Sequence, residues 1–284
     1  MLFGVTPTAD VKYPLSFLQT VTKTYGMIWG ELEGPLSLPL NEPESTLITA
    51  GFDISKFIVN LQQQPSAIDI QFALTNYPDI NYFQIMNEPE GCSPGQGCLT
   101  PQQGFDAVMT AYPLIKKSKP NSTVMAPAVT IFYSSAGVTI LNPTSVNWAK
   151  EFMTLGAGKY FDDAAIHVYP GGDVYQNSAN TATVSAGIDE LYSILGNKPM
   201  YITETGYQSG NDPQVQANNL QALYDIYLSK NYLIGAYWYR MTDYGQPGTT
   251  LGLFDSSFAP KPAATTYKNL ISKSIPTFAV QVNT

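Results

Sequence analysis

Short runs of β-prone residues alternate with helical patches along almost the whole chain, and this alternation limits the folds that the sequence can adopt. The expected strands cover residues 2–6, 27–32, 47–50, 82–85, 123–126, 164–170, 200–203 and 233–238. Strands that alternate with helices predict a parallel α/β architecture, and the length of 284 residues is close to the (β/α)8 norm of about 250. We therefore expect residues 1–284 to form a single (β/α)8 TIM barrel domain.

A doubly wound open sheet is the rival fold for this pattern. That fold carries a glycine fingerprint after its first strand, and residues 6–9 contain no glycine. The expected helices cover residues 14–25, 54–62, 67–76, 101–112, 146–155, 188–195, 213–227 and 261–273. The segment 34–44 is rich in proline and has little periodicity, so we expect a loop there.

Two of the expected strands end in a glutamate. The run 82–85 leads into Asn87-Glu88-Pro89, and the run 200–203 leads into Glu204. Parallel barrels present their reactive groups at the carboxyl ends of strands, and proline ends the ladder of backbone hydrogen bonds there. Although 116 positions separate the two glutamates (204 minus 88), the barrel would bring them together. The sequence therefore predicts a carboxylate pair for the cleavage of sugar bonds.

The composition is low in charge. Charged residues make up 13% of the chain, about half the usual share, and 19 tyrosines contribute to a neutral, hydrogen-bonding surface that suits carbohydrate. The net charge of -8 argues against nucleic acid and anionic membranes as partners. The one basic run, 116–119, is typical of a solvated helix end. No apolar segment approaches the roughly 20 residues that span a bilayer.

Cys92 and Cys98 are the only cysteines, and they flank a loop rich in glycine, proline and serine. Because the chain has a single histidine, a zinc site of the Cys/His type lacks ligands. We expect a disulfide between the two cysteines, with free thiols as the alternative. A disulfide implies an oxidising compartment, and hence an extracellular or cell-surface location, although no signal peptide is visible.

The ordered strand ends resemble those of the retaining glycoside hydrolases of clan A, a superfamily of (β/α)8 enzymes that includes cellulase-like family 5 and xylosidase-like family 39. The likeness covers most of the chain and rests on residues 87–89, 167–169, 203–204, 238 and 251–255. The resemblance implies that Glu88 is the acid/base and Glu204 the nucleophile. Two features depart from the pattern: Met86 stands where many relatives have tryptophan, and the second histidine of family 5 is absent.

Five other residues are candidates for binding the sugar. Asn87 can donate to the 2-hydroxyl, a contact that the superfamily uses, or it can merely shape the turn. His167 and Tyr169 lie two residues apart and thus on one strand face, although a lone histidine is usually a satisfied core group. Trp238 and, less strongly, Trp29 offer flat apolar faces for a pyranose, with a core role as the alternative.

Retaining hydrolysis needs carboxyl groups roughly 5 to 5.5 Å apart. At that separation, two negative charges repel by about 3 kcal/mol at an effective dielectric near 20, so we expect Glu88 to keep a proton while Glu204 is ionised. Glu31, Glu90 and Asp10 are competing acids. Glu31 is expected to line the pocket or to pair within it, and Glu90 is expected to be solvated.

The sequence thus favours a secreted hydrolase that retains configuration at β-linked sugars, with carbohydrate as its partner and neither metal nor cofactor. Two other classes of function compete with it. One is a barrel that binds glycan through tyrosine and tryptophan without cleaving it, and the other is a structural surface protein. The presence of both glutamates disfavours the binding barrel, and a panel of glycosides separates the classes by product release.

Overall fold

The computed structural model describes residues 1–6, 12–32, 44–61, 64–91, 98–243, 248 and 250–274. Its parallel strands are β1 (Leu2–Val5), β2 (Trp29–Leu32), β3 (Ile58–Leu61), β4 (Tyr82–Ile85), β5 (Thr123–Met125), β6 (Val129–Thr130), β9 (Ala164–Val168), β10 (Met200–Thr205) and β11 (Leu233–Trp238). A hairpin of β7 (Phe132–Ser135) and β8 (Val138–Leu141) stands apart from them. Residues 7–11, which include Asp10, and residues 33–43, which include most of the expected loop, lie outside the described part.

The parallel strands form a barrel. They pair in the order β5-β4-β3-β2-β1-β11-β10-β9-β6, and every pair is parallel. The ring closes where β5 and β6 occupy one strand position beside β9. Met125 of β5 forms a bridge with Asp163, the residue before β9, and Val129 of β6 pairs with Ile166 of β9. The (β/α)8 barrel expected from the sequence is confirmed.

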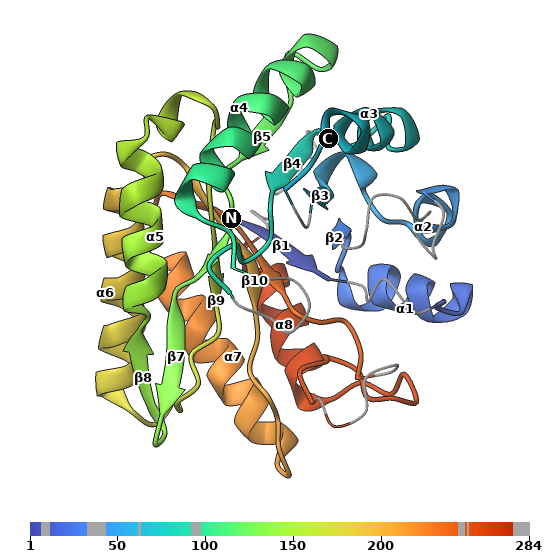
Figure 1. The fold of residues 1–284 in the computed structure, drawn as a ribbon. Coiled ribbons are helices and arrows are strands. Elements are labelled where there is room, and N and C mark those ends of the chain that lie inside the picture. The colour runs from blue at the N-terminus through green and yellow to red at the C-terminus, as the bar shows by residue number, and fades with distance from the viewer. Residues whose placement is uncertain are drawn as a thin grey trace, which may run out of the picture.

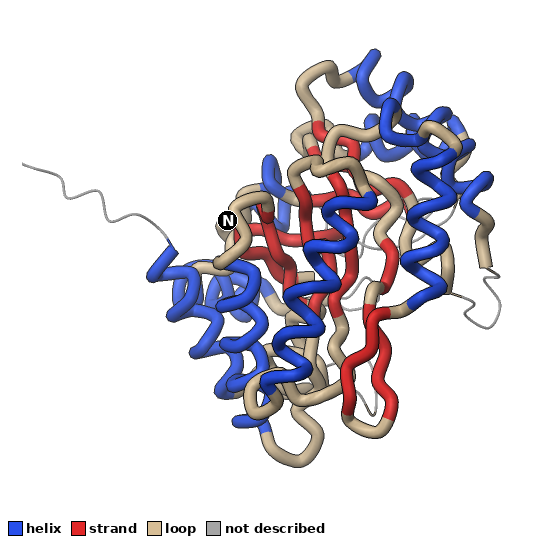
Figure 2. Tube along the Cα trace, turned by 90° about the vertical axis from the view of Figure 1, so that its left-hand side faces the viewer, coloured by secondary structure: helices blue, strands red, loops and turns tan. Residues whose placement is uncertain are grey.

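The helices lie outside the strands. They are α1 (Leu15–Tyr25), α2 (Glu44–Ala50), α3 (Ala67–Asn76), α4 (Pro101–Ser118), α5 (Pro143–Thr154), α6 (Ser178–Ile194), α7 (Pro213–Leu228) and α8 (Pro262–Ser274). Figure 1 shows them around the strands, and the tube view in Figure 2 shows the strands enclosed between helices. Within the described part of the chain, no helix is long and apolar enough to cross a membrane.

The third strand was predicted at the wrong place. Residues 47–50 belong to helix α2, where Leu47 and Ala50 are buried while Ile48 is exposed, which is helical spacing. The predicted helix at 54–62 is instead a single 3-10 turn, η1 (Ile54–Lys56), followed by β3. Because β3 is buried on both faces, its apolar run has no alternation that would distinguish a strand from a helix.

Two apolar clusters fill the interior. The larger one joins the helices to the outer faces of the strands. The smaller one lies inside the barrel near the amino ends of the strands, and it consists of Ile58, Met125, Ala128, Ala165, Tyr201 and Tyr237, with Leu2, Trp29, Tyr82 and Ile234 packed against it. Side chains two positions further along these strands point to the same interior, closer to the carboxyl ends.

Candidate active site

A layer of polar side chains lies above the smaller apolar cluster. Glu31, Asn60, Gln84 and His167 each follow a residue of that cluster by two positions, and all four are buried. Burying polar groups is costly unless they are hydrogen-bonded, so such a layer is expected where it serves a function. It lies towards the carboxyl ends of the strands, where parallel barrels hold their active sites.

Glu88 follows β4 on a strained turn. The backbone is left-handed at Met86, with φ of 72°, and at Glu88, with φ of 43°, so two side-chain-bearing residues on either side of Asn87 adopt a costly conformation. The side chain of Glu88 is 35% exposed. Its Oε1 accepts a hydrogen bond of 2.6 Å from Thr130 Oγ1 and lies 2.9 Å from His167 Nδ1. The carboxylate is thus held on one side and open to solvent on the other.

Glu204 lies near the end of β10 and is buried. The register of β10 shifts against both neighbouring strands just before this position, and such an irregularity re-aims a side chain. Tyr169 donates a hydrogen bond of 2.6 Å to Glu204 Oε2. The hydroxyl of Tyr169, which follows β9, therefore contacts the carboxylate of Glu204 on the neighbouring strand.

His167 lies between the two glutamates. Its Nδ1 faces Glu88, and its Nε2 lies 3.5 Å from Glu204 Oε1. One oxygen of each glutamate and one nitrogen of His167 all lie within 4.8 Å of one another. Within the described part of the chain, these three residues form the group that could hold a metal ion. The two ring nitrogens of His167 face different carboxylates, so a single ion would engage only one of these nitrogens.

The charge of His167 reverses one expectation about Glu88. Burial opposes the charged form of Glu88, but the hydrogen bond and charge of His167, with the Thr130 hydrogen bond, outweigh it and lower the pKa of Glu88. Burial alone would lower the pKa of His167, yet the charge of Glu204 and the contact with Glu88 raise it. Both shifts favour the retained proton on His167 over Glu88, because the imidazole contacts both carboxylates.

Glu31 and Asn87 are joined through one amide. Asn60 Nδ2 donates to Glu31 Oε1 at 2.9 Å and to Asn87 Oδ1 at 2.8 Å, and Gln84 Nε2 lies 3.4 Å from the same Asn87 oxygen. Burial and the charge of Glu204 raise the pKa of Glu31 well above its ordinary value, which favours the neutral form of Glu31. The bonds at Oδ1 leave Nδ2 as the donor that Asn87 can offer to a ligand.

Glu90 is not solvated, contrary to the prediction. Only 7% of it is exposed, and its Oε1 accepts hydrogen bonds from the Thr130 backbone at 2.6 Å and from Ser145 Oγ at 3.0 Å. Burial raises the pKa of Glu90 to about 7. The turn after Glu88 bends this carboxylate back under the barrel rim, and Thr130 thereby contacts both acids.

Neither predicted tryptophan presents a face to a ligand in this structure. Trp238 is fully buried in the larger core and donates to the Leu251 carbonyl at 2.9 Å. Trp29 opens β2, packs on the cluster at the amino ends of the strands and lies 3.5 Å from Asp53 Oδ2. Trp238 follows the inward-facing Tyr237 by one position and therefore points to the outer face of β11, whereas Trp29 lies at the end of the barrel opposite the mouth.

Tyr239 is the aromatic residue that does lie beside the site. It is partly exposed, and its ring meets that of Tyr169 edge-on with centroids 6.3 Å apart. Gly206 permits this approach, since a Cβ there would lie 2.5 Å from the Tyr239 carbonyl oxygen and 3.1 Å from the Tyr169 ring. Tyr169 connects this aromatic pair to Glu204.

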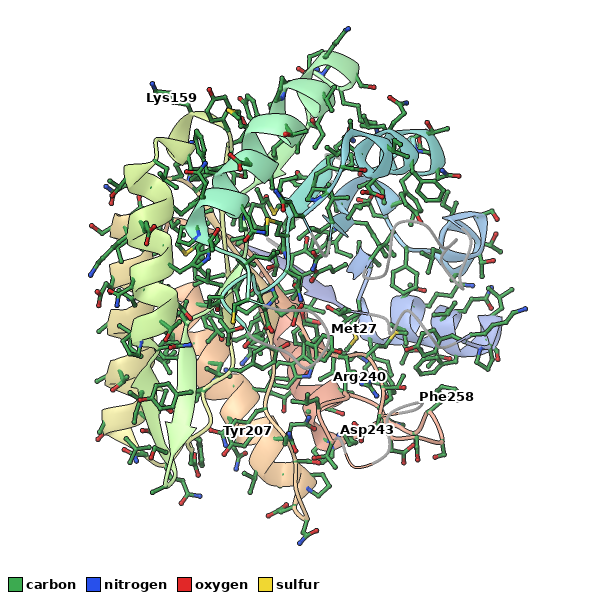
Figure 3. All side chains as sticks on the ribbon, in the orientation of Figure 1. Met27, Lys159, Tyr207, Arg240, Asp243 and Phe258 are labelled. Atoms are coloured by element: carbon green, nitrogen blue, oxygen red, sulfur yellow. The ribbon has the colours of Figure 1, made fainter. Side chains whose placement is uncertain are left out.

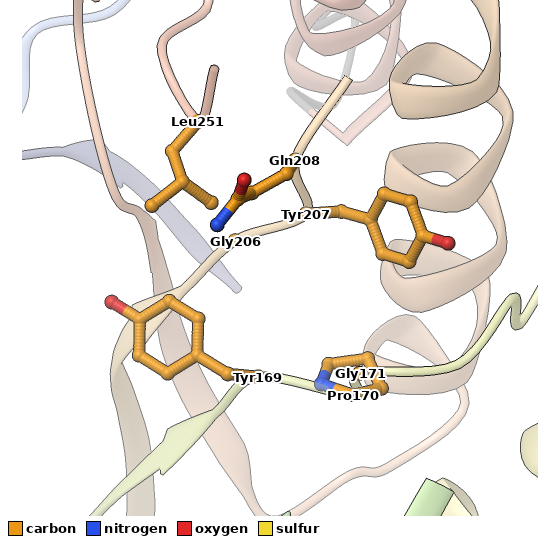
Figure 4. Close-up of a pocket in the computed structure, with 7 residues that line it drawn as sticks. All are labelled: Tyr169, Pro170, Gly171, Gly206, Tyr207, Gln208 and Leu251. Atoms are coloured by element: carbon orange, nitrogen blue, oxygen red, sulfur yellow. The ribbon is translucent and has the colours of Figure 1, made fainter. Parts of the chain in front are cut away.

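A cavity of about 300 Å³ opens next to Tyr169. Its lining consists of Tyr169, Pro170, Gly171, Gly206, Tyr207, Gln208 and Leu251. In Figure 4, Tyr169 and Tyr207 lie on opposite sides of the lining, with Pro170 below and Gln208 and Leu251 above. Tyr169 thus belongs both to the cavity wall and to the hydrogen bond with Glu204.

Sequence reasoning missed Asn60, Gln84, Thr130 and Tyr239. Asn60 and Gln84 left a signal, namely a lone amide inside an apolar strand run, two positions after a large apolar residue. Thr130 left none, because β6 has only two residues. The predicted Cys92–Cys98 disulfide stays a prediction, because Cys92 lies in residues 92–97, outside the described part.

One protein-family model covers most of the chain. The family model described as "Glycosyl hydrolase catalytic core" matches residues 43–267. No curated protein matches the sequence.

Several solved structures share the fold. A GH128 subgroup I endo-β-1,3-glucanase from Amycolatopsis mediterranei, in complex with laminaripentaose, is 17% identical with a TM-score of 0.63, over 94% of this chain and 98% of that one. A family 39 glycoside hydrolase from Bacteroides cellulosilyticus is 16% identical with a TM-score of 0.68, over 95% of this chain and 63% of that one. A GH2 β-galacturonidase from Eisenbergiella tayi is 18% identical with a TM-score of 0.63, over 95% of this chain and 50% of that one.

Proposed function

Because the chain belongs to the glycosyl hydrolase catalytic core family, we propose that it cleaves β-glycosidic bonds with retention of configuration, using Glu204 as nucleophile and Glu88 as acid/base. The observation that carries the proposal is the approach of the two carboxylates, whose oxygens lie within 4.8 Å. Retaining enzymes keep their carboxyl groups about 5 to 5.5 Å apart, whereas inverting enzymes need roughly 6.5 to 9.5 Å to admit a water.

The reaction runs in two displacements. Glu204 attacks the anomeric carbon, the bond from that carbon to the leaving oxygen breaks, and Glu88 gives its proton to that oxygen. Glu88 then takes a proton from water, which attacks the anomeric carbon and releases Glu204. The Tyr169 hydroxyl, at 2.6 Å, holds the Glu204 carboxylate in place for both steps.

His167 supplies the proton that Glu88 transfers. The Glu88–His167 pair holds one proton, on His167 in the resting site, and the contact of 2.9 Å lets it move to Glu88 Oε1. The glycosidic oxygen approaches the open side of Glu88. In the first displacement Glu204 loses its negative charge, which stabilises the imidazolium form of His167. Proton transfer from the Glu88–His167 pair to the leaving oxygen therefore becomes easier.

Neighbouring side chains orient the sugar. The amide nitrogen of Asn87, whose oxygen is held by Asn60, donates to the 2-hydroxyl. The partly exposed Tyr239 ring provides the apolar face that was expected from tryptophan.

We propose β-1,3-glucan oligosaccharides as the first substrates to try. The support is that solved endo-β-1,3-glucanases with this fold bind laminaripentaose and laminarihexaose. We also propose that the chain is a single catalytic domain that works outside the cytosol. The low charge and the pair Cys92 and Cys98 support that location.

The test is a panel of aryl β-glycosides and β-glucans assayed with three forms of the protein. Glu204→Gln should lower turnover by about a thousandfold or more, since it removes the nucleophile. Glu190→Gln is the matched control, because this exposed glutamate lies on α6 in a surface pair with Lys150, 3.6 Å away, and its loss should leave turnover unchanged. Near-normal rates for Glu204→Gln, or no product from any substrate, would contradict the proposal.

A further inference from the structure

Glu31 is a buried acid that the two displacements do not use. It lies on β2, is fully buried, and points into the barrel two positions after Trp29. In Figure 3, Met27, two residues before β2, lies among other side chains in the middle of the molecule, whereas Lys159 lies at its edge. A carboxyl group in such a place is costly, because it gives up its hydration. The position of Glu31 in the same polar layer as His167 therefore calls for a function.

Three polar side chains lie side by side on β2, β3 and β4. The strands pair in the order β4-β3-β2, and Asn60 is the direct register partner of Gln84. Asn60 Nδ2 donates to Glu31 Oε1 at 2.9 Å and to Asn87 Oδ1 at 2.8 Å. Within the described part of the chain, the hydrogen bond from Asn60 is the only one that the Glu31 side chain makes. Glu31 therefore contacts the sugar-binding groups through Asn60.

This chain of hydrogen bonds has a defined direction. The amide of asparagine carries an acceptor oxygen and a donor nitrogen on opposite sides. Because Glu31 Oε1 accepts, it keeps the nitrogen of Asn60, rather than its oxygen, on the side of Glu31. The same nitrogen gives its second hydrogen to Asn87 Oδ1, and Asn87 is left with its own nitrogen to offer to a ligand. The acceptor on Glu31 thus fixes Asn87 as a donor.

Asn87 needs such support, because its backbone is irregular. It lies two positions beyond the end of β4, and the backbone is left-handed at Met86 and Glu88 on either side. The regular ladder of the strand therefore does not fix its side chain. The second hydrogen bond to its oxygen, from Gln84 Nε2, is long at 3.4 Å. Asn60 is the stronger of the two contacts that orient Asn87.

The role does not require a charge on Glu31. Burial and the charge of Glu204 raise the pKa of Glu31 well above its ordinary value, which favours the neutral carboxyl group. A neutral carboxyl group keeps a carbonyl oxygen, and that oxygen accepts a hydrogen bond as an amide oxygen does. A glutamine side chain has nearly the same shape and offers the same acceptor.

We infer that Glu31 is a positioning residue, whose carboxyl oxygen orients Asn87 through Asn60 so that the Asn87 nitrogen donates to the 2-hydroxyl of the sugar. This inference rests on the proposed function and deepens it, because it gives Glu31 a part in orienting the substrate rather than in proton transfer. Glu31→Gln should therefore be tolerated, although Glu204→Gln is not.

The experiment measures kcat/KM on an aryl β-glucoside or β-laminaribioside, whichever the wild type cleaves faster, and on its analogue without the 2-hydroxyl next to the aryl group. The ratio of the two values is compared between proteins, so that the intrinsic reactivity of each substrate cancels. Glu31→Leu has no acceptor and should lower kcat/KM by about tenfold or more on the full substrate, but by less than about threefold on the 2-deoxy analogue. Glu31→Gln should stay within about threefold of the wild type on both.

Three outcomes would overturn the inference. Equal losses for Glu31→Leu on both substrates would mean that Glu31 does not act on the 2-hydroxyl, and the retaining mechanism would stand. A loss of about a thousandfold for Glu31→Gln, as expected for Glu204→Gln, would mean that Glu31 acts through its charge or proton. No cleavage of any glycoside or β-glucan by the wild type would remove the proposed function and this inference with it.

Two further variants test the route through Asn60. Asn60→Leu, of similar shape, should repeat the pattern of Glu31→Leu, and the double variant should lose no more than either single one. If Glu31→Leu does not fold, Glu31→Gln and Asn60→Leu decide the question. An Asn60→Leu variant that keeps the wild-type ratio would contradict the route.

Val59→Ala is the matched control. Val59 precedes Asn60 on β3 and packs in the larger core, outside the polar layer. The substitution leaves a cavity and should lower the stability, but it should keep the wild-type ratio between the two substrates. A ratio that changes as much in Val59→Ala as in Glu31→Leu would mean that a general loosening of β3 is the cause, and it would contradict the inference.

Discussion

His167 determines where the proton of the active site is held. It contacts Glu88 at 2.9 Å and Glu204 at 3.5 Å, and the two contacts raise its pKa while that of Glu88 is lowered. Because the two groups are coupled, a proton on His167 and a proton on Glu88 are two forms of the same singly protonated pair. The pair is therefore competent for acid catalysis as long as it holds one proton, and activity falls when the pair loses it at a pH above the ordinary value for histidine.

The shared proton of His167 and Glu88 leads to a prediction for His167→Gln. A pair of sites binds one proton more tightly than either site alone, so without the imidazole the proton must be held by Glu88 by itself. The alkaline limb of the kcat/KM profile should move to lower pH by about one unit or more. The measurement is a pH–rate profile on an aryl glycoside, with Glu190→Gln as the control that keeps the wild-type limb. An alkaline limb that stays in place would show that His167 does not hold the catalytic proton.

A second prediction concerns the buried Glu90. Its pKa rises from 4.5 to about 7 on folding, so the folded state binds the proton more tightly, and the resulting stabilisation is present below pH 4.5 and is lost as pH rises through 7. The full shift corresponds to about 3 kcal/mol in the free energy of unfolding. Glu90→Gln keeps the acceptor oxygen for Thr130 and Ser145 and cannot ionise.

Urea unfolding at pH 5 and pH 8 checks this prediction. The variant should gain stability relative to the wild type between the two values, by an amount on the order of 3 kcal/mol. Contributions from other groups cancel in the difference. If the free energies of unfolding of the variant and the wild type changed in parallel between pH 5 and pH 8, the buried, protonated state of Glu90 would be refuted.

The sequence predicted the positions of Glu88, Glu204, His167 and Tyr169, because each stands at the end of a strong strand pattern. It did not predict the proton distribution, which depends on a contact between residues 79 positions apart. It also misjudged Glu90, since a carboxylate two residues after Glu88 reads as solvated unless the left-handed turn at Glu88 is known.

At the scale of the elements, most helices and strands were predictable from periodicity and end signals. The expected start of α4 at residue 101 is confirmed, and a capping box holds it: Thr100 accepts from the Gln103 backbone at 3.2 Å, and Gln103 accepts from the Thr100 backbone at 2.9 Å. The hairpin β7–β8 was missed. Its two-residue turn, Ala136-Gly137, has positive φ at both positions. Such turns are predicted most strongly by Asn-Gly or Asp-Gly, and a single glycine after alanine predicts them only weakly.

The cap of α4 gives a prediction at this scale. Thr100→Ala removes the side-chain oxygen that satisfies a backbone N–H of the first turn, and it should cost about 1 kcal/mol in the free energy of unfolding. Thr110→Ala is the matched control, because Thr110 lies in the same helix, is exposed, and donates only to the Asp106 carbonyl at 2.8 Å. Its change should stay within about 0.5 kcal/mol. Equal losses for both variants in urea unfolding would mean that the capping box does not stabilise α4.

At the scale of the whole molecule, barrel closure makes the site possible. The ring of parallel strands brings residues 88 and 204 together, and α8 secures it where Tyr267 donates to the Gly4 carbonyl of β1 at 2.6 Å. The number and spacing of strands predicted this closure. The sequence pattern did not predict the register shifts in β10, which aim Glu204, because a shift depends on the pairing of three strands rather than on local propensity.

The close pair of carboxylates is the central feature, and the configuration of the first product tests it most directly. The experiment follows hydrolysis of a β-linked substrate by proton NMR, before the sugar product equilibrates between its anomers. The account predicts that the β-anomer appears first, because Glu204 can reach the anomeric carbon and a second displacement restores the configuration. First appearance of the α-anomer would mean a single displacement by water, and it would contradict Glu204 as the nucleophile.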